Sequence, residues 1–259
     1  MRITVYGENR HEKTDPTVQE LYPDGMHTVI AEGLRSVLGE DGVETEVRIA
    51  LLDDIEDSLS EEVLAQTDVL TWWGHMAHDD VPDEVAERVV RHVRDGMGLL
   101  ALHSAHYAKP FTRLMGTTCN LLWRNDGEEE RVWTVNGSHP IARGVPHPIV
   151  IPAQEMYGEM FDIPAPDELV FVSSFAGGEV FRSGCCFRRG KGKVFYFSPG
   201  DQEYPVYYQP EIRRVLANAA TWARPEDRDR TPVKIANAPA GWWREDHRTD
   251  DGEEITRVI

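Results

Sequence analysis

Four of the chain's ten histidines stand directly after two short apolar segments. They form two pairs, His75 with His78 and His103 with His106. Neutral imidazole is a common ligand of zinc and related metals, and histidine is also the side chain that most readily exchanges a proton near neutral pH. The spacing matches neither a zinc finger nor a His-Glu-x-x-His helix. The position of the pairs therefore predicts one reactive site, either a metal site or a site of metal-free acid–base chemistry.

Acidic residues add candidate ligands and proton carriers. Glu8 and His11 follow the first apolar segment of the chain, and Glu155 and Glu159 flank Tyr157. Residues four apart share one face of a helix, so the two later glutamates either lie on such a face or one of them points inward from a turn. The alternative for both groups is an ordinary solvated surface.

Side chains suited to sugar binding are also present. Arg182 can bind hydroxyls or carboxylates through its planar guanidinium. Trp72, Trp73, Trp123 and Trp133 can stack on sugar rings, although large aromatic side chains more often belong to the core.

Nucleophilic and nucleotide chemistry are disfavoured. Ser104 lies at a strand-to-helix turn, but not within the Gly-x-Ser-x-Gly pattern of a nucleophile elbow. Cys119 is more consistent with a core position. The glycines Gly96 and Gly98 precede an apolar segment rather than a helix, so they do not form a dinucleotide-binding loop, and no nucleotide cofactor is expected.

The elements that must position these residues alternate in type. Apolar segments typical of strands cover residues 2–6, 43–52, 69–73 and 98–102. Helical spacing covers residues 25–39, 60–64 and 82–95. This alternation predicts an α/β fold with a parallel sheet and right-handed crossovers. Since ligands in such sheets bind beyond the carboxyl ends of the strands, three strand ends are expected to bring Glu8, His11 and the histidine pairs to one edge.

The pattern changes from about residue 120. Short strands separated by turns are predicted over 131–135, 169–173, 178–182 and 186–197, with a hairpin turn at 190–193, and a last helix over 211–222. The expected organisation is one α/β domain over residues 1–225 and a charged C-terminal extension over residues 226–259.

Composition narrows the class of protein. Forty-five acidic residues against 27 basic ones give a net charge of −18, which disfavours nucleic-acid binding because phosphate contacts need clustered lysine and arginine. No apolar stretch is long enough to span a membrane, and the first residues read as a strand rather than a signal peptide. Three cysteines do not make a disulfide framework. A reduced, cytoplasmic protein is expected.

Taken together, several stretches resemble the ThuA family, the trehalose utilisation proteins. They are Gly7-Glu-Asn-x-His-Glu, Tyr22-Pro-x-Gly-Met-His, Trp72-Trp-Gly-His-x-Ala-His-Asp, Gly96-Met-Gly-Leu-Leu-x-Leu-His-Ser-x-His, Leu114-Met-Gly-Thr-Thr-Cys, Ser138-His-Pro-Ile, Glu155-Met-Tyr-Gly-Glu, Glu179-Val-Phe-Arg-Ser-Gly and Phe195-Tyr-Phe-x-Pro-Gly. The resemblance covers about residues 2–224 in order.

The resemblance implies a fold like that of class I glutamine amidotransferases, a flavodoxin-like three-layer sandwich with a mostly parallel central sheet. In amidotransferases the elbow carries a cysteine nucleophile, whereas His103 stands at that position here, so glutaminase chemistry is not expected. The resemblance also implies a role in the catabolism of trehalose and related disaccharides, with a functional link to oxidoreductases that make 3-keto sugars.

One stretch departs from the family pattern. Relatives usually read Pro-Gly-His-Glu-Thr-Tyr-Pro where this chain reads Pro-Gly-Asp-Gln-Glu-Tyr-Pro from residue 199. Asp201 thus replaces a histidine and Gln202 replaces a glutamate. A carboxylate in place of an imidazole favours harder metal ions or an altered activity.

These observations lead to one leading hypothesis, an enzyme that acts on a disaccharide or a 3-keto-glycoside. A divalent metal ion, with zinc as the first expectation, is expected on the candidate ligands His11, His75, His103 and Glu155. The candidate proton carriers are Glu8, His78, His106 and Glu159. The candidate substrate-binding residues are Trp73, Arg182 and Asp201. A homo-oligomer is left open, and the alternative function is a non-catalytic sugar-binding or regulatory protein.

Overall fold

A computed structural model of the protein describes residues 1–226 and 235–239. All helices and strands of this described part belong to one compact unit, residues 1–228. A second unit spans residues 229–259; within it, residues 235–239 are exposed and form neither helix nor strand. The expected charged extension over 226–259 therefore falls almost entirely outside the described residues.

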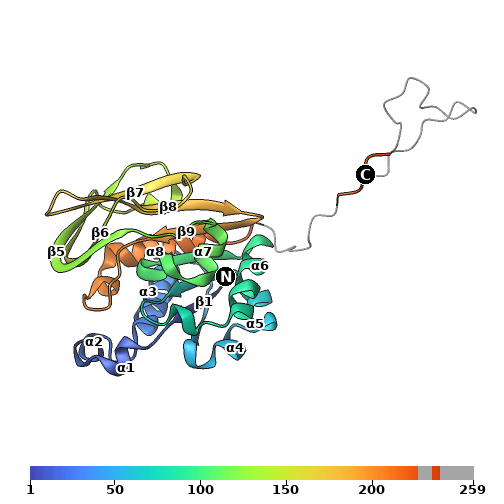
Figure 1. Ribbon diagram of the computed structural model, residues 1–259, viewed down its shortest axis with the longest axis horizontal. Helices are drawn as coiled ribbons and strands as arrows, with labels where there is room; N and C mark the ends of the chain where they lie inside the picture. The colour runs from blue at the N-terminus through green and yellow to red at the C-terminus, as the bar shows by residue number, and fades with distance from the viewer. Residues whose placement is uncertain (227–234, 240–259) are drawn as a thin grey trace, which may run out of the picture. The chain divides into compact units, whose positions relative to one another are not determined.

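A nine-stranded sheet runs through the compact unit in the order β2-β1-β3-β4-β9-β8-β7-β5-β6 (Figure 1). The strands of its parallel half are β1 (Arg2–Gly7), β2 (Glu46–Leu51), β3 (Val69–Trp73), β4 (Gly98–Leu102) and β9 (Gly192–Phe197). The antiparallel half adds β5 (Leu122–Thr134), β6 (Ile149–Gly158), β7 (Glu168–Phe175) and β8 (Val180–Arg189).

The expectation of a mostly parallel sheet is not confirmed. Only the pairs that involve β1 to β4 are parallel, whereas β9-β8, β8-β7, β7-β5 and β5-β6 are all antiparallel. A parallel pair needs a long crossover, usually a helix, between its strands. Between residues 122 and 197 the strands are interrupted only by the short 3-10 turn η4 (Pro140–Ala142), so no helical crossover is available there, and strands that neighbour each other in the sheet run antiparallel. The hairpin turn predicted at 190–193 joins β8 to β9.

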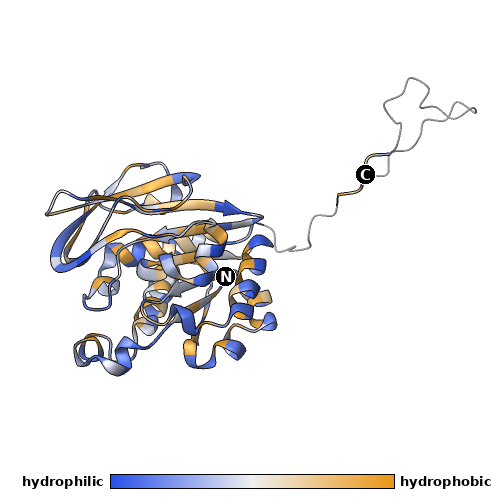
Figure 2. Cartoon of the chain, in the orientation of Figure 1, coloured by the Kyte–Doolittle hydropathy of each residue, from blue (hydrophilic) through white to orange (hydrophobic). Residues whose placement is uncertain are grey.

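Helices cover both faces of the parallel half, which makes the expected three layers (Figure 1). They are α1 (His11–Thr14), α2 (Pro16–Leu21), α3 (Met26–Glu40), α4 (Ile55–Ser58), α5 (Glu61–Gln66), α6 (Asp83–Arg94), α7 (Lys109–Met115) and α8 (Pro210–Ala223). In Figure 2 the helices carry polar residues on their outer sides, and the strands combine hydrophobic with hydrophilic stretches, β5 being largely hydrophilic.

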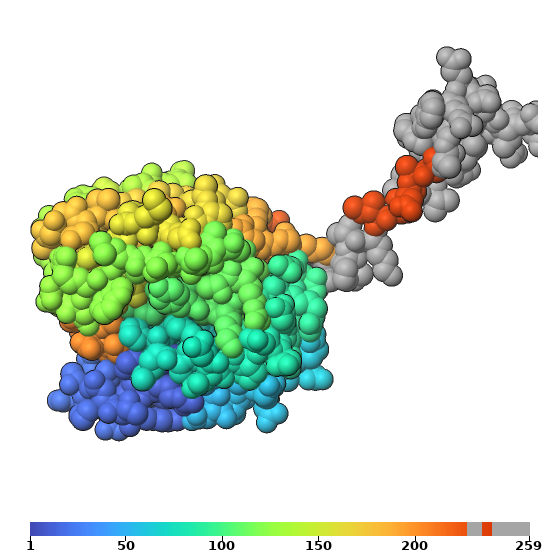
Figure 3. Space-filling view, in the orientation of Figure 1, coloured from blue at the N-terminus to red at the C-terminus, as the bar shows by residue number. Residues whose placement is uncertain are grey.

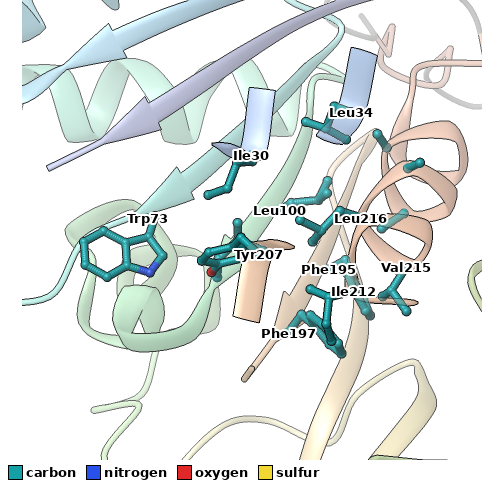
Figure 4. Close-up of a cluster of buried hydrophobic side chains, with 14 of the residues drawn as sticks. Ile30, Leu34, Trp73, Leu100, Phe195, Phe197, Tyr207, Ile212, Val215 and Leu216 are labelled. Atoms are coloured by element: carbon teal, nitrogen blue, oxygen red, sulfur yellow. The ribbon is translucent and has the colours of Figure 1, made fainter. Parts of the chain in front are cut away.

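Two cores result, one on each face of the sheet. In the first, α3 and α8 bury Ile30, Leu34 and Leu216 against Leu100 and Phe195 of the sheet (Figure 4). In the second, one face of α6 packs against the opposite face of the sheet through a stripe of valines, Val85, Val89, Val90 and Val93. Because both faces of β4 are covered, its fully apolar sequence is explained.

Two local predictions need correction. The segment with Glu155 is not helical; it belongs to β6, which ends at Gly158, so Glu159 stands just beyond the strand. The polar segment after the first strand, for which the sequence pattern predicts no element, contains the short helices α1 and α2. On the face shown in Figure 3, the green residues lie between the yellow and orange residues above and the blue and cyan N-terminal residues below.

Among residues 1–226 and 235–239, no helix combines the length and the hydropathy that crossing a bilayer requires.

Candidate metal centre

His103 occupies a sharp turn between the buried strand β4 and the 3-10 segment η3 (His103–Tyr107). Its φ of 51° lies in the left-handed region, which is uncommon for a residue other than glycine and turns the chain abruptly after Leu102. The Nδ1 atom lies 2.7 Å from the carbonyl oxygen of Ser198. Since a carbonyl can only accept a hydrogen bond, Nδ1 carries a proton and Nε2 is the nitrogen left for chemistry.

Three further side chains converge on this histidine. One ligand atom from each of His75, His103, Glu155 and Asp201 lies within 4.8 Å of all the others. His75 follows β3, Glu155 lies in β6, and Asp201 follows β9. The cluster therefore joins the parallel half of the sheet to the antiparallel half.

The two carboxylates approach Nε2 of His103 at the distances of ion pairs. Oε2 of Glu155 lies 3.0 Å from Nε2 and Oδ2 of Asp201 lies 3.4 Å from it. Both oxygens are nevertheless buried without a hydrogen-bond partner. Buried oxygens of this kind are costly unless another group satisfies them. Two carboxylates and two imidazoles at these distances form a donor set that suits a divalent cation.

The charges of the cluster follow from burial and from the carboxylates. Burial alone would lower the pKa of His103, but the adjacent Asp201 and Glu155 outweigh it and raise the pKa to about 10. Burial would raise the pKa of Asp201, and the neighbouring His103 lowers it below its ordinary value. Burial and the nearby His103 lower the pKa of His75 to about 4. Without a cation, His103 is therefore protonated at neutral pH while His75 is neutral.

The backbone around Asp201 is held in place from several sides. Gly200 has a φ of 137°, and a Cβ at this position would collide with the hydroxyl of Tyr207, so only glycine fits. The backbone N–H of Asp201 donates to the side-chain oxygen of Gln154 at 3.4 Å, and Oδ1 of Asp201 accepts from the N–H of Glu203 at 2.8 Å. The departure from the family pattern at residue 201 thus places a fixed carboxylate in the cluster.

His11, a predicted ligand, lies one step away from the cluster. Its Nε2 is 3.2 Å from Nδ1 of His75, at the start of α1. This contact fixes the ring of His75 and leaves Nε2 of His75 for the cluster. Asp201, predicted to bind substrate, is the fourth member of the cluster.

Glu8, a predicted proton carrier, is fully engaged by the backbone. Its carboxylate accepts hydrogen bonds from the N–H groups of His75, Met76 and Ala77 at 2.8, 3.0 and 2.9 Å. The carboxylate is buried and shapes the turn that carries His75. The geometry supports positioning of that ligand more than proton transfer.

His78 and His106 flank the ring of Tyr107 rather than joining the four ligands. Nδ1 of His106 lies 2.8 Å from the carbonyl oxygen of Cys119, so Nε2 is again the basic nitrogen. Burial lowers the pKa of His106 to about 3 and also lowers that of His78. Both rings are therefore neutral near pH 7, and Nε2 of His78 is buried without a partner.

Three other predicted residues are occupied elsewhere. Glu159 and Arg182 form a two-pronged ion pair, with distances of 2.8 and 2.9 Å. Trp73 is buried, and its Nε1–H donates to the carbonyl oxygen of Gly200 at 3.0 Å (Figure 4 shows its ring in the core). A stacking contact between Trp73 and a sugar does not fit this burial; the side chain instead holds the loop that carries Asp201.

Two features of the site were not assigned from the sequence. Tyr157 stacks on the ring of His103 with centroids 4.7 Å apart, and its hydroxyl lies 3.2 Å from Nε2 of His103 and 2.7 Å from Oγ of Ser104. Its place between Glu155 and Glu159 was the only sequence signal.

Glu130 is the second feature of the site that was not assigned from the sequence. It is fully buried in β5, lies 2.5 Å from the donating hydroxyl of Ser173, and has its pKa raised to about 7 by burial. Nothing in the local sequence distinguishes it from the adjacent Glu128 and Glu129.

A match to a protein-family model identifies the family of this chain. Residues 2–223 match the ThuA family, described as trehalose utilisation. The chain belongs to the ThuA family. No curated protein matches it.

Solved structures agree on the fold. A ThuA-like protein from Bacteroides uniformis is 15% identical, with a TM-score of 0.60 over 86% of this chain and 90% of that one. A second ThuA-like protein, from Parabacteroides merdae, is 15% identical with a TM-score of 0.58 over 92% of each chain. A protein from Salmonella typhimurium LT2, described as cytoplasmic, is 12% identical with a TM-score of 0.57 over 86% of this chain and all of that one. At these identities the likeness concerns the fold alone.

Proposed function

We propose that this ThuA protein is a metal-dependent enzyme of sugar catabolism that acts on a disaccharide or a 3-keto-glycoside. The observation that carries the proposal is the convergence of His75, His103, Glu155 and Asp201 within 4.8 Å. The family supports a sugar-related role. The two unpartnered carboxylate oxygens support a bound cation, because a divalent ion would satisfy both of them and balance their charge.

The residues around the cluster would position the metal ligands, activate the sugar and accept the proton. A divalent ion on these four ligands would act as a Lewis acid toward a carbonyl or hydroxyl of the sugar. Glu8 and His11 hold His75 in place through the contacts given above. His106 is neutral near pH 7 and keeps Nε2 as its basic nitrogen, and it is the proposed proton acceptor. Tyr157 orients His103 and presents a hydroxyl beside it.

A keto group at C3, two carbons from the glycosidic carbon C1, makes this arrangement chemically sufficient. The carbonyl acidifies the C–H bond at C2, so a base such as His106 can remove that proton. The electron pair then forms a C1–C2 double bond as the bond from C1 to the leaving sugar oxygen breaks, and that oxygen takes up a proton. Two carboxylates placed on either side of a scissile bond, as in ordinary glycosidases, are not required. This chemistry favours a 3-keto-glycoside, supplied by a sugar oxidoreductase, over an unoxidised disaccharide.

Asp201 favours one alternative. Because the family usually has a histidine at this position, the cluster in this chain carries one more negative charge and one imidazole less than its relatives. A protein that binds the sugar without converting it, as a sensor or a regulatory partner, is the second candidate. Saturable sugar binding without product from any keto-glycoside would favour it.

The setting of the protein is part of the same proposal. We place it in the cytoplasm, as the Salmonella protein of similar fold is described. Its expected partners remain a small sugar and a functionally linked oxidoreductase, with no nucleic acid or nucleotide cofactor and with self-association left open.

The test combines metal analysis with a substrate screen. The purified protein is analysed for bound metal, and trehalose and its 3-keto derivative are offered to the wild type and to the His75→Ala and His103→Ala variants. We expect bound divalent metal and turnover of the keto sugar in the wild type, and loss of both in the variants. His147→Ala, an exposed histidine outside the cluster, is the control and should retain both. A metal-free wild type, with turnover that survives both substitutions, would overturn the proposal.

A further inference from the structure

Trp123 is an exposed aromatic side chain next to the candidate metal centre. It lies near the start of β5 with 63% of its surface accessible. Its partner across the antiparallel ladder is Tyr157 of β6. Directly paired residues on antiparallel strands project from the same face of the sheet, with their Cβ atoms about 5 Å apart. Trp123 therefore stands on the face from which Tyr157 reaches Nε2 of His103.

The same face of β5 also contacts the loop that carries Asp201. Asn125, two residues beyond Trp123, donates to Oε2 of Glu203 at 3.2 Å and accepts from the hydroxyl of Tyr204 at 2.6 Å. The backbone N–H of Glu203 in turn donates to Oδ1 of Asp201, so a chain of hydrogen bonds runs from the amide of Asn125 to the cluster. A flat aromatic surface beside a few fixed polar groups is the usual composition of a small-molecule site.

The adjacent residue on the strand provides a contrast. Leu122 is 53% exposed, but it projects from the opposite face, where it contacts the position of Gly158. Its surroundings are the ion pair of Arg124 and Glu179 and not the metal centre. Exposure alone therefore does not distinguish the two residues; the face of the strand does.

We propose that Trp123 forms a subsite for the second ring of a disaccharide, with Asn125 and Glu203 receiving its hydroxyls. The proposal rests on the proposed function, because it assumes that the reacting ring lies at the cluster of His103 and Glu155. The apolar face of a pyranose ring covers the indole, and the polar edge of the ring faces the amide and the carboxylate. The subsite makes the protein select two-ring sugars over single rings.

The test measures sugar binding by calorimetry, separately from turnover. Trehalose and glucose are titrated into the wild type and into the Trp123→Ala, Trp123→Phe and Leu122→Ala variants. We expect Trp123→Ala to bind trehalose about tenfold more weakly, the scale of one lost aromatic contact, with glucose binding unchanged. Trp123→Phe should retain most of the affinity, and Leu122→Ala all of it.

Two results would overturn the subsite. One is unchanged trehalose binding in Trp123→Ala. The other is a change of oligomeric state in Trp123→Ala, seen by light scattering, which would assign the indole to an interface between copies of the chain. Because the titration measures sugar binding and not turnover, it still tests the subsite if the metal-dependent chemistry of the proposed function proves wrong. A failed subsite likewise leaves the metal content and the turnover of the wild type unaffected.

Discussion

The two halves of the sheet contribute to the site in different ways. The parallel half presents His75 and His103 from the ends of β3 and β4, at positions that follow from the topology alone. The antiparallel half presents Glu155 and Tyr157 from within β6, where the pairing with β5 contains register shifts. In the parallel half, the carboxyl ends of the strands meet at one edge, so residues that follow them lie close together. In the antiparallel half, the position of a side chain depends on the register in which two strands pair. The candidate centre exists only where the two halves meet.

Removing a ligand from either half should have the largest effect. His103→Asn removes a ligand of the parallel half and Glu155→Gln one of the antiparallel half. We expect each to weaken binding of a divalent metal by more than about a hundredfold, since losing even an outer partner of a metal ligand costs about 10- to 100-fold. Metal affinity measured with a competing chelator checks this. Glu129→Gln, an exposed glutamate of β5, should match the wild type. Normal metal affinity in Glu155→Gln would show that the parallel half suffices.

The coupling between the halves should also appear as a pH dependence of metal binding. The carboxylates raise the pKa of His103 to about 10, so its proton must leave when a metal binds. His75 has its pKa lowered to about 4 and has no proton to lose at neutral pH. We therefore expect release of about one proton per ion near pH 8 and an affinity that rises with pH until about pH 10. Calorimetry in buffers of different ionisation enthalpy measures this number, and a value near zero would contradict the charge assignment.

In the metal-free protein, the same proton has the opposite consequence for stability. A histidine whose pKa is raised by folding stabilises the fold fully below its ordinary pKa of 6.5, and this contribution is lost as the pH rises through about 10. Metal-free wild type should therefore lose stability above neutral pH more steeply than His103→Asn. Urea unfolding at pH 6.5 and pH 9.5 distinguishes the two, and parallel losses would argue against an imidazolium in the cluster.

Tyr157 tests how much the antiparallel half contributes beyond its ligand. Tyr157→Phe keeps the ring stacked on His103 but removes the hydroxyl 3.2 Å from Nε2. We expect turnover to fall about tenfold, in the lower range for an outer partner of a metal ligand, while metal content and thermal stability stay close to those of the wild type. Ser104→Ala, which removes the other partner of that hydroxyl, should have a smaller effect. Loss of metal in Tyr157→Phe would instead make the hydroxyl part of the binding site.

The same contrast explains which parts of the site the sequence predicts. Apolar segments alternating with helices fix the direction of β1, β3 and β4, and with it the edge at which His75 and His103 meet. The inward position of Glu155 depends on the register shifts between Arg124 and Glu130, because a shift by one residue exchanges the two faces of a strand. Nothing in the local sequence distinguishes Glu155 from Glu159 without that register.

The sequence also does not predict the role of a side chain when that role depends on backbone groups from distant parts of the chain. Glu8 and Asp201 are both acidic residues after a strand, yet one accepts three backbone N–H groups and the other enters the cluster. Their roles follow from the backbone that each one meets, and that backbone comes from elsewhere in the chain.

Glu130 allows a smaller and purely thermodynamic test of the antiparallel half. Burial raises its pKa to about 7, so folding favours the protonated carboxyl. A carboxyl of this kind contributes most to stability below its ordinary pKa of 4.5 and progressively less as the pH rises to about 7. Glu130→Gln keeps an oxygen for the hydroxyl of Ser173 and cannot ionise. We expect the variant to gain on the order of 2 kcal/mol relative to the wild type between pH 4.5 and pH 8.

Urea unfolding of both proteins across this pH range provides the measurement, with Glu129→Gln as the exposed control on the same strand. A gain that grows from about pH 4.5 to about pH 7 and then levels off identifies the buried carboxyl as its source. An equal difference at every pH would mean that the substitution acts through packing. The ionisation of Glu130 would then have no effect on stability.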